Sequence, residues 1–149
     1  MKLTKLRQAL IEHNVDAILI TNEYNRRYMT GFTGTAGVAI VSQNDAVFIT
    51  DFRYTEQASE QIKDFRIAQH TGPIFEEVAK QAELMGVKSL AFEKDAMHFG
   101  TYEVYKSAVK ADFIPVSGLI EKIRLIKTAE EINIIKVACE IADNAFTHI

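Results

Sequence analysis

Three glycines recur at every third position in the segment TGFTGTAG, residues 30–37. Glycine adopts positive φ angles and lets the backbone approach other groups closely, so this segment must bend tightly or lie against another surface. Its spacing matches neither G-x-G-x-x-G nor G-x-x-x-x-G-K-S/T, and a strand pattern follows at residues 38–41. Both phosphate-binding motifs open a helix instead, which argues against a phosphate site. Residues 31–37, the glycine loop, are therefore either a structural connection or a loop that reaches into an active site.

Apolar residues alternate between helical periodicity and strand-length runs along the chain, which is typical of an α/β fold. The polar residues 42–45 join two short apolar runs, so those two strands are predicted to be antiparallel neighbours. Pro115 cannot donate to a central ladder, which predicts an edge strand at residues 112–116. We therefore predict an α/β fold with a mixed sheet of about six strands and helices on both faces. The predicted strands are residues 15–20, 36–41, 46–50, 65–69, 87–92 and 112–116.

Arg53 follows Asp51 where the second strand of the predicted hairpin ends. Asp is a favoured N-cap residue, so Asp51 is predicted to start a helix and Arg53 to lie in its first turn. The helix macrodipole disfavours a cation there, so the arginine needs another explanation. One is contact with a peptide carboxylate or a partner chain, because open α/β sheets place ligands at the carboxyl ends of strands. The other is a local ion pair with Asp51 or Glu56.

Composition and charge exclude several classes of protein. The net charge of −3 over 149 residues gives no electrostatic reason to expect nucleic acid as a partner. Cys139 is the single cysteine, so no intrachain disulfide is possible. Charges interrupt the N-terminal apolar pattern, unlike a signal peptide, and no apolar run approaches the ~20 residues that span a bilayer. We expect a soluble, cytoplasmic protein that binds neither nucleic acid nor membrane.

No residue pattern points to catalysis within the chain. The four histidines lack a paired acid at metal spacing such as H-E-x-x-H, so each is expected to be a surface or core residue. No serine has the G-x-S-x-G setting of a nucleophile elbow. Three tyrosines are expected to pack in the core or at an interface. These residues are His13, His70, His98 and His148, and Tyr24, Tyr28 and Tyr54.

The end of the chain differs from the rest. Thr128 and Glu131 form a capping box, and an apolar stripe continues from there to the last residue without a C-cap. We interpret residues 1–121 as an α/β domain, 122–127 as a linker and 128–149 as the first helix of a second, absent domain. Because that helix lacks the surface it packs against, we expect it to fray or to pair with another molecule.

Three segments in a fixed order cover the chain: NRRYMTGFTG at residues 25–34, TDFRY at 50–54 with QA at 57–58, and RLIK at 124–127 with EEI at 130–132. Together they resemble the creatinase/prolidase family, and most closely its Xaa-Pro aminopeptidases and dipeptidases. The family patterns are N-x-x-Y-L-T-G-F-x-G, T-D-x-R-Y-x-x-Q-A and the interdomain R-x-I-K-x-x-x-E-I.

The resemblance implies that this chain is a non-catalytic N-terminal domain of the family's α/β type, with an RNase H-like motif. In the family, catalysis belongs to a following "pita-bread" domain, where two aspartates, a histidine and two glutamates hold two divalent metal ions, expected to be Mn, Co or Zn. We therefore expect this chain to fold without metal and to lack peptidase activity. Met29 stands where leucine is common and Thr35 where serine is common, and neither distinguishes a dipeptidase from an aminopeptidase.

The resemblance also implies that the full-length enzyme acts on proline-containing peptides and forms a homo-oligomer. Phe32 is the only large apolar side chain in the glycine loop, and we expect it at an exposed tip, where aromatic residues mark contact sites. The alternative is a free-standing binding or dimerisation module with a related fold, which has little use for a helix after Thr128. The candidates for the substrate pocket or the oligomer interface are Phe32, Thr33, Gly34, Thr35, Arg53 and Tyr54.

Overall fold

The computed structural model describes residues 2–148, in which strands and helices alternate as the sequence predicts. The strands are β1 (Ala17–Ile20), β2 (Val38–Ser42), β3 (Ala46–Thr50), β4 (Arg66–Gln69), β5 (Ser89–Glu93) and β6 (Asp112–Val116). The helices are α1 (Lys2–Glu12), α2 (Glu23–Thr30), α3 (Thr55–Gln61), α4 (Ile74–Leu84), α5 (Phe99–Ala108), α6 (Leu119–Leu125) and α7 (Ala129–His148).

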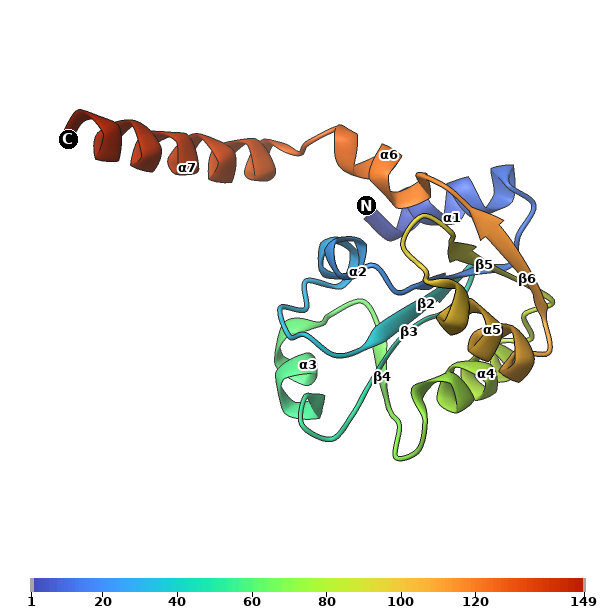
Figure 1. Cartoon of the computed structure of the whole chain (residues 1–149). Helices are drawn as coiled ribbons and strands as arrows, with labels where there is room; N and C mark the ends of the chain where they lie inside the picture. Colours follow the sequence, from blue (N-terminus) through green and yellow to red (C-terminus); the bar gives the residue numbers. More distant parts are fainter. Residues whose placement is uncertain (1, 149) are drawn as a thin grey trace.

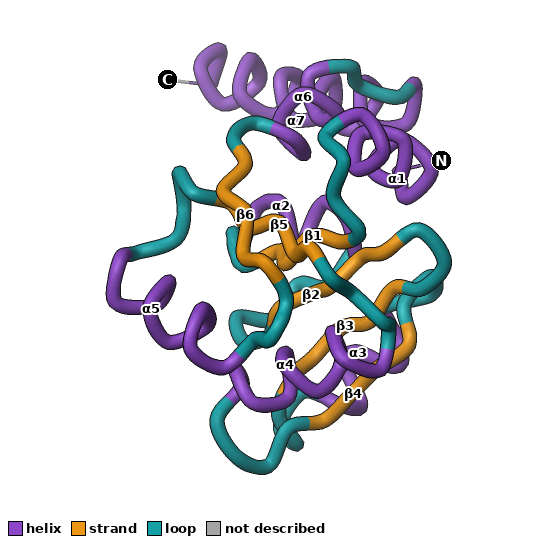
Figure 2. The backbone as a smooth tube through the Cα atoms, turned by 90° about the vertical axis from the view of Figure 1, so that its right-hand side faces the viewer, coloured by secondary structure: helices purple, strands orange, loops and turns teal. Residues whose placement is uncertain are grey.

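The strands form one mixed sheet in the order β4-β3-β2-β1-β5-β6 (Figures 1 and 2). Strand β2 runs antiparallel to both β1 and β3, whereas the pairs β1–β5, β5–β6 and β3–β4 are parallel. The carboxyl ends of β1, β3, β4, β5 and β6 therefore meet at one edge of the sheet, which we call the carboxyl edge. Pro115 lies in β6, an outer strand, which confirms the predicted edge position.

Helices cover both faces of the sheet, which confirms the predicted fold class. One face packs against α1, α2, α3 and α6 through buried residues such as Leu6, Met29 and Ile120. The opposite face packs against α4 and α5, through Val78 and Tyr105 among others. Strands β1, β2 and β3 are buried along their whole length, so their apolar side chains fill both layers of the core.

The start of helix α3 differs from the sequence prediction. The helix begins at Thr55, and Tyr54 at its N-cap position makes no side-chain capping hydrogen bond. A turn separates β3 from the helix, closed by the Tyr54 N–H donating to the Asp51 carbonyl oxygen at 3.1 Å. Asp51 is therefore not an N-cap residue, and Arg53 lies outside the helix. The macrodipole argument for a function of Arg53 is wrong for this reason.

Helix α6 occupies much of the segment that we predicted as a linker, residues 122–127. It runs to Leu125, and Leu119, Ile120 and Ile123 are buried in the core beside α1. The apolar side chains at positions 120 and 123 share one face of the helix. The free energy gained by burying them favours a helix here, although the residues between them are charged. The assignment of residues 1–121 and 128–149 to two domains stays a prediction.

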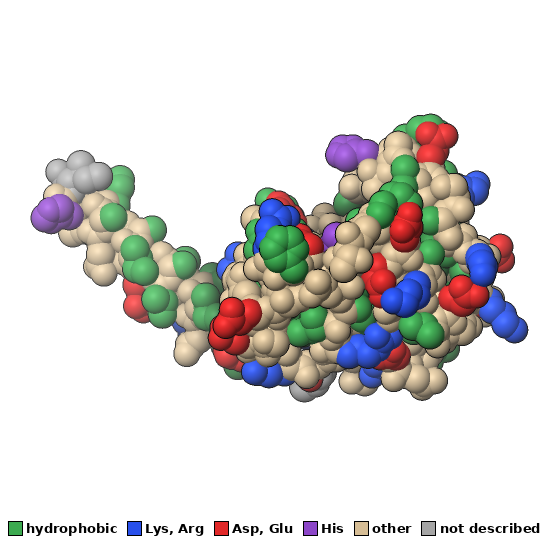
Figure 3. All heavy atoms as spheres, turned by 90° about the horizontal axis from the view of Figure 1, so that it is seen from below, with side chains coloured by type: hydrophobic (Ala, Val, Ile, Leu, Met, Phe, Trp, Pro, Cys, Tyr) green, Lys and Arg blue, Asp and Glu red, His purple; other side chains and the backbone are tan. Residues whose placement is uncertain are grey.

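Helix α7 extends away from the sheet, and none of its residues is buried (Figure 1). The predicted capping box is present, because the Thr128 N–H donates to Glu131 Oε2 at 2.9 Å and the Glu131 N–H to Thr128 Oγ1 at 3.2 Å. Hydrophobic side chains are exposed along the helix, with Phe146 at 83% (Figure 3). Across residues 2–148, α7 included, no helix combines the length and apolar character that a membrane crossing requires.

Candidate functional site

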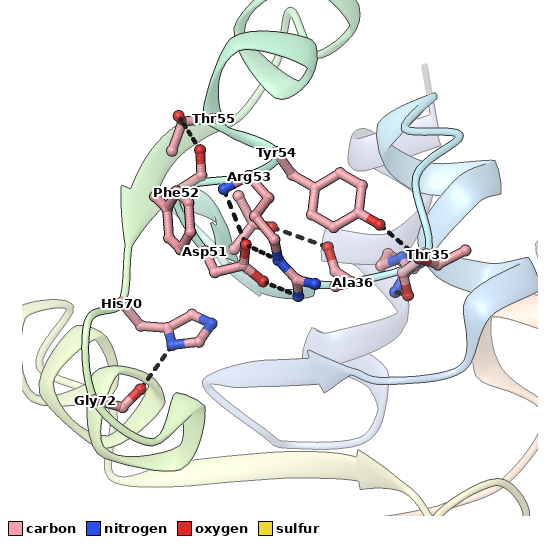
Figure 4. A network of polar contacts seen from close by, with 11 residues as sticks. Thr35, Ala36, Asp51, Phe52, Arg53, Tyr54, Thr55, His70 and Gly72 are labelled. Carbon is pink, nitrogen blue, oxygen red and sulfur yellow. Dashed lines mark hydrogen bonds and ion pairs between the residues drawn. The ribbon is translucent and has the colours of Figure 1, made fainter.

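The D-F-R-Y turn, residues 51–54, lies at the carboxyl edge of the sheet, directly after β3 (Figure 4). His70 follows the neighbouring strand β4, and its Nδ1 lies 2.7 Å from the Gly72 carbonyl oxygen. Thr35 of the glycine loop reaches the same place, since its hydroxyl lies 2.8 Å from the Tyr54 hydroxyl. The structure therefore brings together the two segments that supply all the predicted site residues.

Arg53 forms a local ion pair with Asp51. Its Nε and Nη2 donate to the two carboxylate oxygens at 2.9 and 2.8 Å, and its backbone N–H donates to Oδ1 at 3.0 Å. The hydrogen bond from Arg53 is the main reason why the pKa of Asp51 falls to about 2, and the charge of His70 adds a smaller effect. The Arg53 side chain is 62% exposed. Within residues 2–148 its Nη1 donates no hydrogen bond, so the pair orients the guanidinium and leaves donors free.

Phe32 does not lie at an exposed tip, and this prediction is wrong. Its side chain is fully buried, with its ring centroid 4.7 Å from that of Phe48 and 5.8 Å from that of Tyr54. The glycine loop folds back over the sheet, and burial of a large apolar side chain stabilises this arrangement by about 1.5–3 kcal/mol. Phe32 therefore anchors the loop in the core and offers no contact to a ligand.

Gly34 and Gly37 allow the loop to lie against these aromatic rings. A Cβ at Gly34 would lie 2.7 Å from Phe32 Cε1, closer than non-bonded atoms approach. At Gly37, φ is +139° and a Cβ would lie 2.9 Å from the Ile49 carbonyl oxygen. Gly34, one of the predicted site residues, thus permits close packing and presents no side chain to a substrate.

Thr33 connects the glycine loop to helix α3. Its backbone N–H donates to Gln61 Oε1 at 2.9 Å, and its hydroxyl accepts a hydrogen bond from Gln57 Nε2 at 3.1 Å. Thr33 remains exposed to solvent on its other side. The Gln57–Thr33 hydrogen bond therefore joins the first two segments of the family pattern, and the Thr35–Tyr54 contact lies directly beside it in the chain.

Phe52 is a candidate residue that the sequence analysis missed. Its side chain is 73% exposed and it precedes Arg53 in the turn. Its only sequence signal is its position inside T-D-x-R-Y, at the variable residue of that pattern. Exposed aromatic and charged side chains that contribute nothing to the core are typical of contact sites. We define the loop–turn surface as Thr33, Thr35, Phe52, Arg53 and Tyr54.

Asn25 is a second residue whose role was not predicted. It is fully buried, and its Nδ2 donates to Glu93 Oε1 at 2.6 Å and to Glu121 Oε1 at 2.5 Å. Arg124 Nη1 donates to Asn25 Oδ1 at 2.8 Å. Burial raises the pKa of Glu93, although hydrogen bonds from the Asn22 N–H and the Asn25 amide oppose this effect. Asn25 thus joins the first family-like segment to the third.

Tyr28 lies near the start of α7, where it lines a groove of ≈ 480 Å³ together with Arg124, Glu131 and Ile135. Lys2 Nζ lies 4.0 Å from the centroid of its ring and also forms an ion pair with Glu131 at 3.4 Å. Tyr28 therefore packs at the junction between the sheet domain and α7, which agrees with the predicted packing role.

The described part of the chain does not fit a metal centre. Residues 2–148 contain no group of three or more His, Cys, Asp or Glu side chains that could hold a metal ion. His70 is the histidine beside the loop–turn surface, and it contacts a backbone carbonyl oxygen. The location of two metal ions in a second domain stays a prediction.

Comparison with known proteins agrees with this geometry. The model of the Creatinase/Prolidase N-terminal domain matches residues 2–126. The uncharacterized peptidase YqhT of Bacillus subtilis (strain 168) is 49% identical over 150 residues, covering 100% of this chain and 42% of that protein. The structure of a Xaa-Pro dipeptidase from Bacillus anthracis has a TM-score of 0.97 at 54% identity, covering 99% of this chain and 41% of that one.

A shorter relative matches at nearly its full length. The N-terminal domain of the cytoplasmic peptidase PepQ from Mycobacterium tuberculosis H37Rv has a TM-score of 0.75 at 29% identity, covering 81% of this chain and 96% of that one. The mixed sheet with its glycine loop and D-F-R-Y turn thus defines an N-terminal α/β domain of the kind found in peptidases. The chain belongs to the creatinase/prolidase N-terminal domain family, as the resemblance implied. It spans less than half the length of the two Bacillus relatives.

Proposed function

We propose that this chain is the non-catalytic N-terminal domain of a cytoplasmic, metal-dependent Xaa-Pro peptidase, and that its loop–turn surface shapes the substrate pocket or the interface of a homo-oligomer. Relatives named Xaa-Pro dipeptidase support this proposal, at 54% identity in Bacillus anthracis and 31% in Pyrococcus horikoshii. Under this proposal a second domain hydrolyses proline-containing peptides with two Mn, Co or Zn ions, as the family resemblance implies, and residues 2–148 contribute no metal ligand set.

The Asp51–Arg53 pair, in which the Arg53 side chain is 62% exposed, is the observation that carries the role of the surface. A surface ion pair contributes little to stability, about 0–1 kcal/mol, so stability does not account for this arrangement. Asp51 holds the guanidinium at the carboxyl edge of the sheet, next to the exposed ring of Phe52. The free donors of Arg53 suit a carboxylate, either the terminus of a peptide or an acidic residue of a second subunit.

The test is Arg53→Ala in the full-length enzyme. If Arg53 binds a carboxylate in the transition state, kcat/KM falls by about tenfold or more, because a lost hydrogen bond to a charged group costs about 1.5–3 kcal/mol. The melting temperature stays nearly unchanged. Carboxyl NMR titration gives an internal check, because the pKa of Asp51 rises from about 2 towards 3.8 once its partner is removed.

Arg66→Ala is the matched control. Arg66 pairs with Asp45 at 2.8 Å on the opposite edge of the sheet, with its side chain 42% exposed, and it lies outside the loop–turn surface. We expect wild-type kinetics for this variant. Wild-type kinetics for Arg53→Ala as well, with a lower melting temperature, would leave Arg53 as a structural residue only.

The isolated 149-residue chain is expected to hydrolyse no Xaa-Pro peptide and to keep its fold after treatment with a chelator. Circular dichroism before and after chelation measures the fold, and peptide cleavage by the rigorously purified chain measures activity. Loss of ellipticity on metal removal, or cleavage that survives purification, would contradict the assignment of catalysis to a second domain.

A further inference from the structure

Arg26 of helix α2 is directed into the glycine loop rather than into solvent. Its side chain is only 5% exposed. Nη1 donates to the Gly37 carbonyl oxygen at 2.7 Å and to the Thr35 carbonyl oxygen at 3.3 Å, and Nη2 donates to the Gly34 carbonyl oxygen at 2.8 Å. One guanidinium therefore holds three carbonyl groups within a stretch of four residues.

This cation is buried without an ion pair. No carboxylate of residues 2–148 lies within salt-bridge distance of Arg26, and its Nε has no hydrogen-bond partner among those residues. Burial lowers its pKa, although the charge of Glu23 opposes this effect. A buried charge is unfavourable unless it is compensated, and here three carbonyl groups of the loop provide the compensation instead of a carboxylate. The three carbonyl contacts point to a role in fixing the conformation of the loop.

The glycine loop needs such a constraint. Glycine at three of its seven positions gives the free backbone many conformations, and its carbonyl groups have no strand or helix ladder to pair with. The guanidinium centre also lies 5.9 Å from the centroid of the Phe32 ring, inside the curve of the loop. Phe32 anchors the start of the loop by apolar burial, and Arg26 binds its middle and end from within.

We infer that Arg26 is a positioning residue, which latches the glycine loop in one conformation and so presents Thr33 and Thr35 beside Tyr54 at the loop–turn surface. The part of this inference that concerns catalysis rests on the proposed function. Lysine cannot replace the latch, because a single ammonium group lacks the planar fork that spans the carbonyl oxygens of Gly34 and Gly37.

The first experiment measures loop order in this chain by NMR. In Arg26→Met we expect lower backbone order parameters for residues 33–37 and amide exchange at Phe32 and Thr33 that is roughly tenfold faster. Arg27→Met is the control, since Arg27 is the next residue of the same helix and is exposed. If Arg26→Met does not fold, Arg26→Lys keeps the charge and the volume and is expected to loosen the same residues. Loop order in Arg26→Lys and Arg26→Met equal to that in Arg27→Met would overturn the latch.

The second experiment separates the latch from the proposed function. In the full-length enzyme, well below the melting temperature, Arg26→Lys should lower kcat/KM while Arg27→Lys leaves it unchanged. A loosened loop with wild-type kinetics would establish the latch and overturn the proposal that the loop–turn surface shapes the substrate pocket. An ordered loop with impaired kinetics would overturn the latch. The proposed function would then be tested by the Arg53→Ala variant alone.

Discussion

Helices α2 and α7 differ in how many of their residues are buried in the protein core. Helix α2 has eight residues, and four of them are buried: Asn25, Arg26, Met29 and Thr30. Helix α7 has twenty residues, an apolar stripe and a complete capping box, yet it buries none. The shorter and more polar helix is thus the one that packs into the core. Capping residues and helix propensity determine where a helix begins, whereas packing against the rest of the protein determines how much the helix contributes to stability.

The largest test of this contrast compares one phenylalanine from each region. Phe32→Ala is expected to lower the free energy of unfolding by about 3–5 kcal/mol, since it removes a fully buried ring from the core. Phe146→Ala removes a ring that is 83% exposed, and the expected change is below about 0.5 kcal/mol. Urea denaturation measures both. Equal losses would show that α7 packs on the domain in solution.

Asn25→Ala gives the next largest effect. It removes hydrogen bonds to Glu93, Glu121 and Arg124, and we expect a loss of about 2–3 kcal/mol at pH 7. Asn133→Ala on the exposed surface of α7 is the matched control, and alanine there should be neutral or slightly stabilising.

The loss caused by Asn25→Ala should depend on pH. Burial raises the pKa of Glu93 in the folded state, so its ionised form opposes folding, and the Asn25 amide relieves part of this cost. The relief is present above the folded pKa and disappears as pH falls through it towards 4.5. The difference between variant and wild type should therefore shrink between pH 7 and pH 4.5. A constant difference would mean that Glu121 and Arg124 carry the whole effect.

Gly34→Ala tests the close packing of the glycine loop. We expect a loss of about 1–3 kcal/mol, because the added methyl group meets the ring of Phe32. Gly100→Ala is the comparison, since Gly100 lies in helix α5 with open space around it. Alanine there should stabilise the protein by about 0.5–1 kcal/mol. Thermal melts should show a lower melting temperature for Gly34→Ala and a higher one for Gly100→Ala. An unchanged melting temperature for Gly34→Ala would show that the loop shifts freely.

The smallest effect on the domain is expected from Thr128→Ala. It removes the capping box, which weakens α7 by about 0.5–2 kcal/mol. The unfolding of the sheet domain should not change, because α7 buries no residue against it. Far-UV circular dichroism should show reduced helicity, and hydrogen exchange should show weak protection after Thr128 even in the wild type. Strong protection in the monomer at high dilution would contradict this view.

The sequence by itself determined the order of the elements and the class of the fold. Apolar runs marked every strand to within a few residues, Thr128 marked the start of α7, and Pro115 marked the edge strand. Three short motifs identified the family. These features depend on residues that are close in the sequence, because both the side-chain periodicity of strands and helices and the hydrogen bonds of helix caps involve near neighbours in the chain.

The tertiary structure alone decided the site. Phe32 looked like an exposed tip because its flanking residues are small, but the loop turns it onto Phe48, which is 16 positions away along the chain. The sequence analysis gave Asn25 and Arg26 no role, yet both are buried. Asn25 donates to Glu93 of β5, and Arg26 donates to carbonyl groups of the glycine loop. The local ion pair of Arg53 with Asp51 was one of the two explanations offered by the sequence, whereas the structure decided that the turn moves the start of α3 to Thr55 and leaves Arg53 outside the helix. For Phe32 and Asn25 the deciding contact joins segments whose proximity no local pattern encodes, because burial and hydrogen bonding depend on the assembled layers rather than on the adjacent residues.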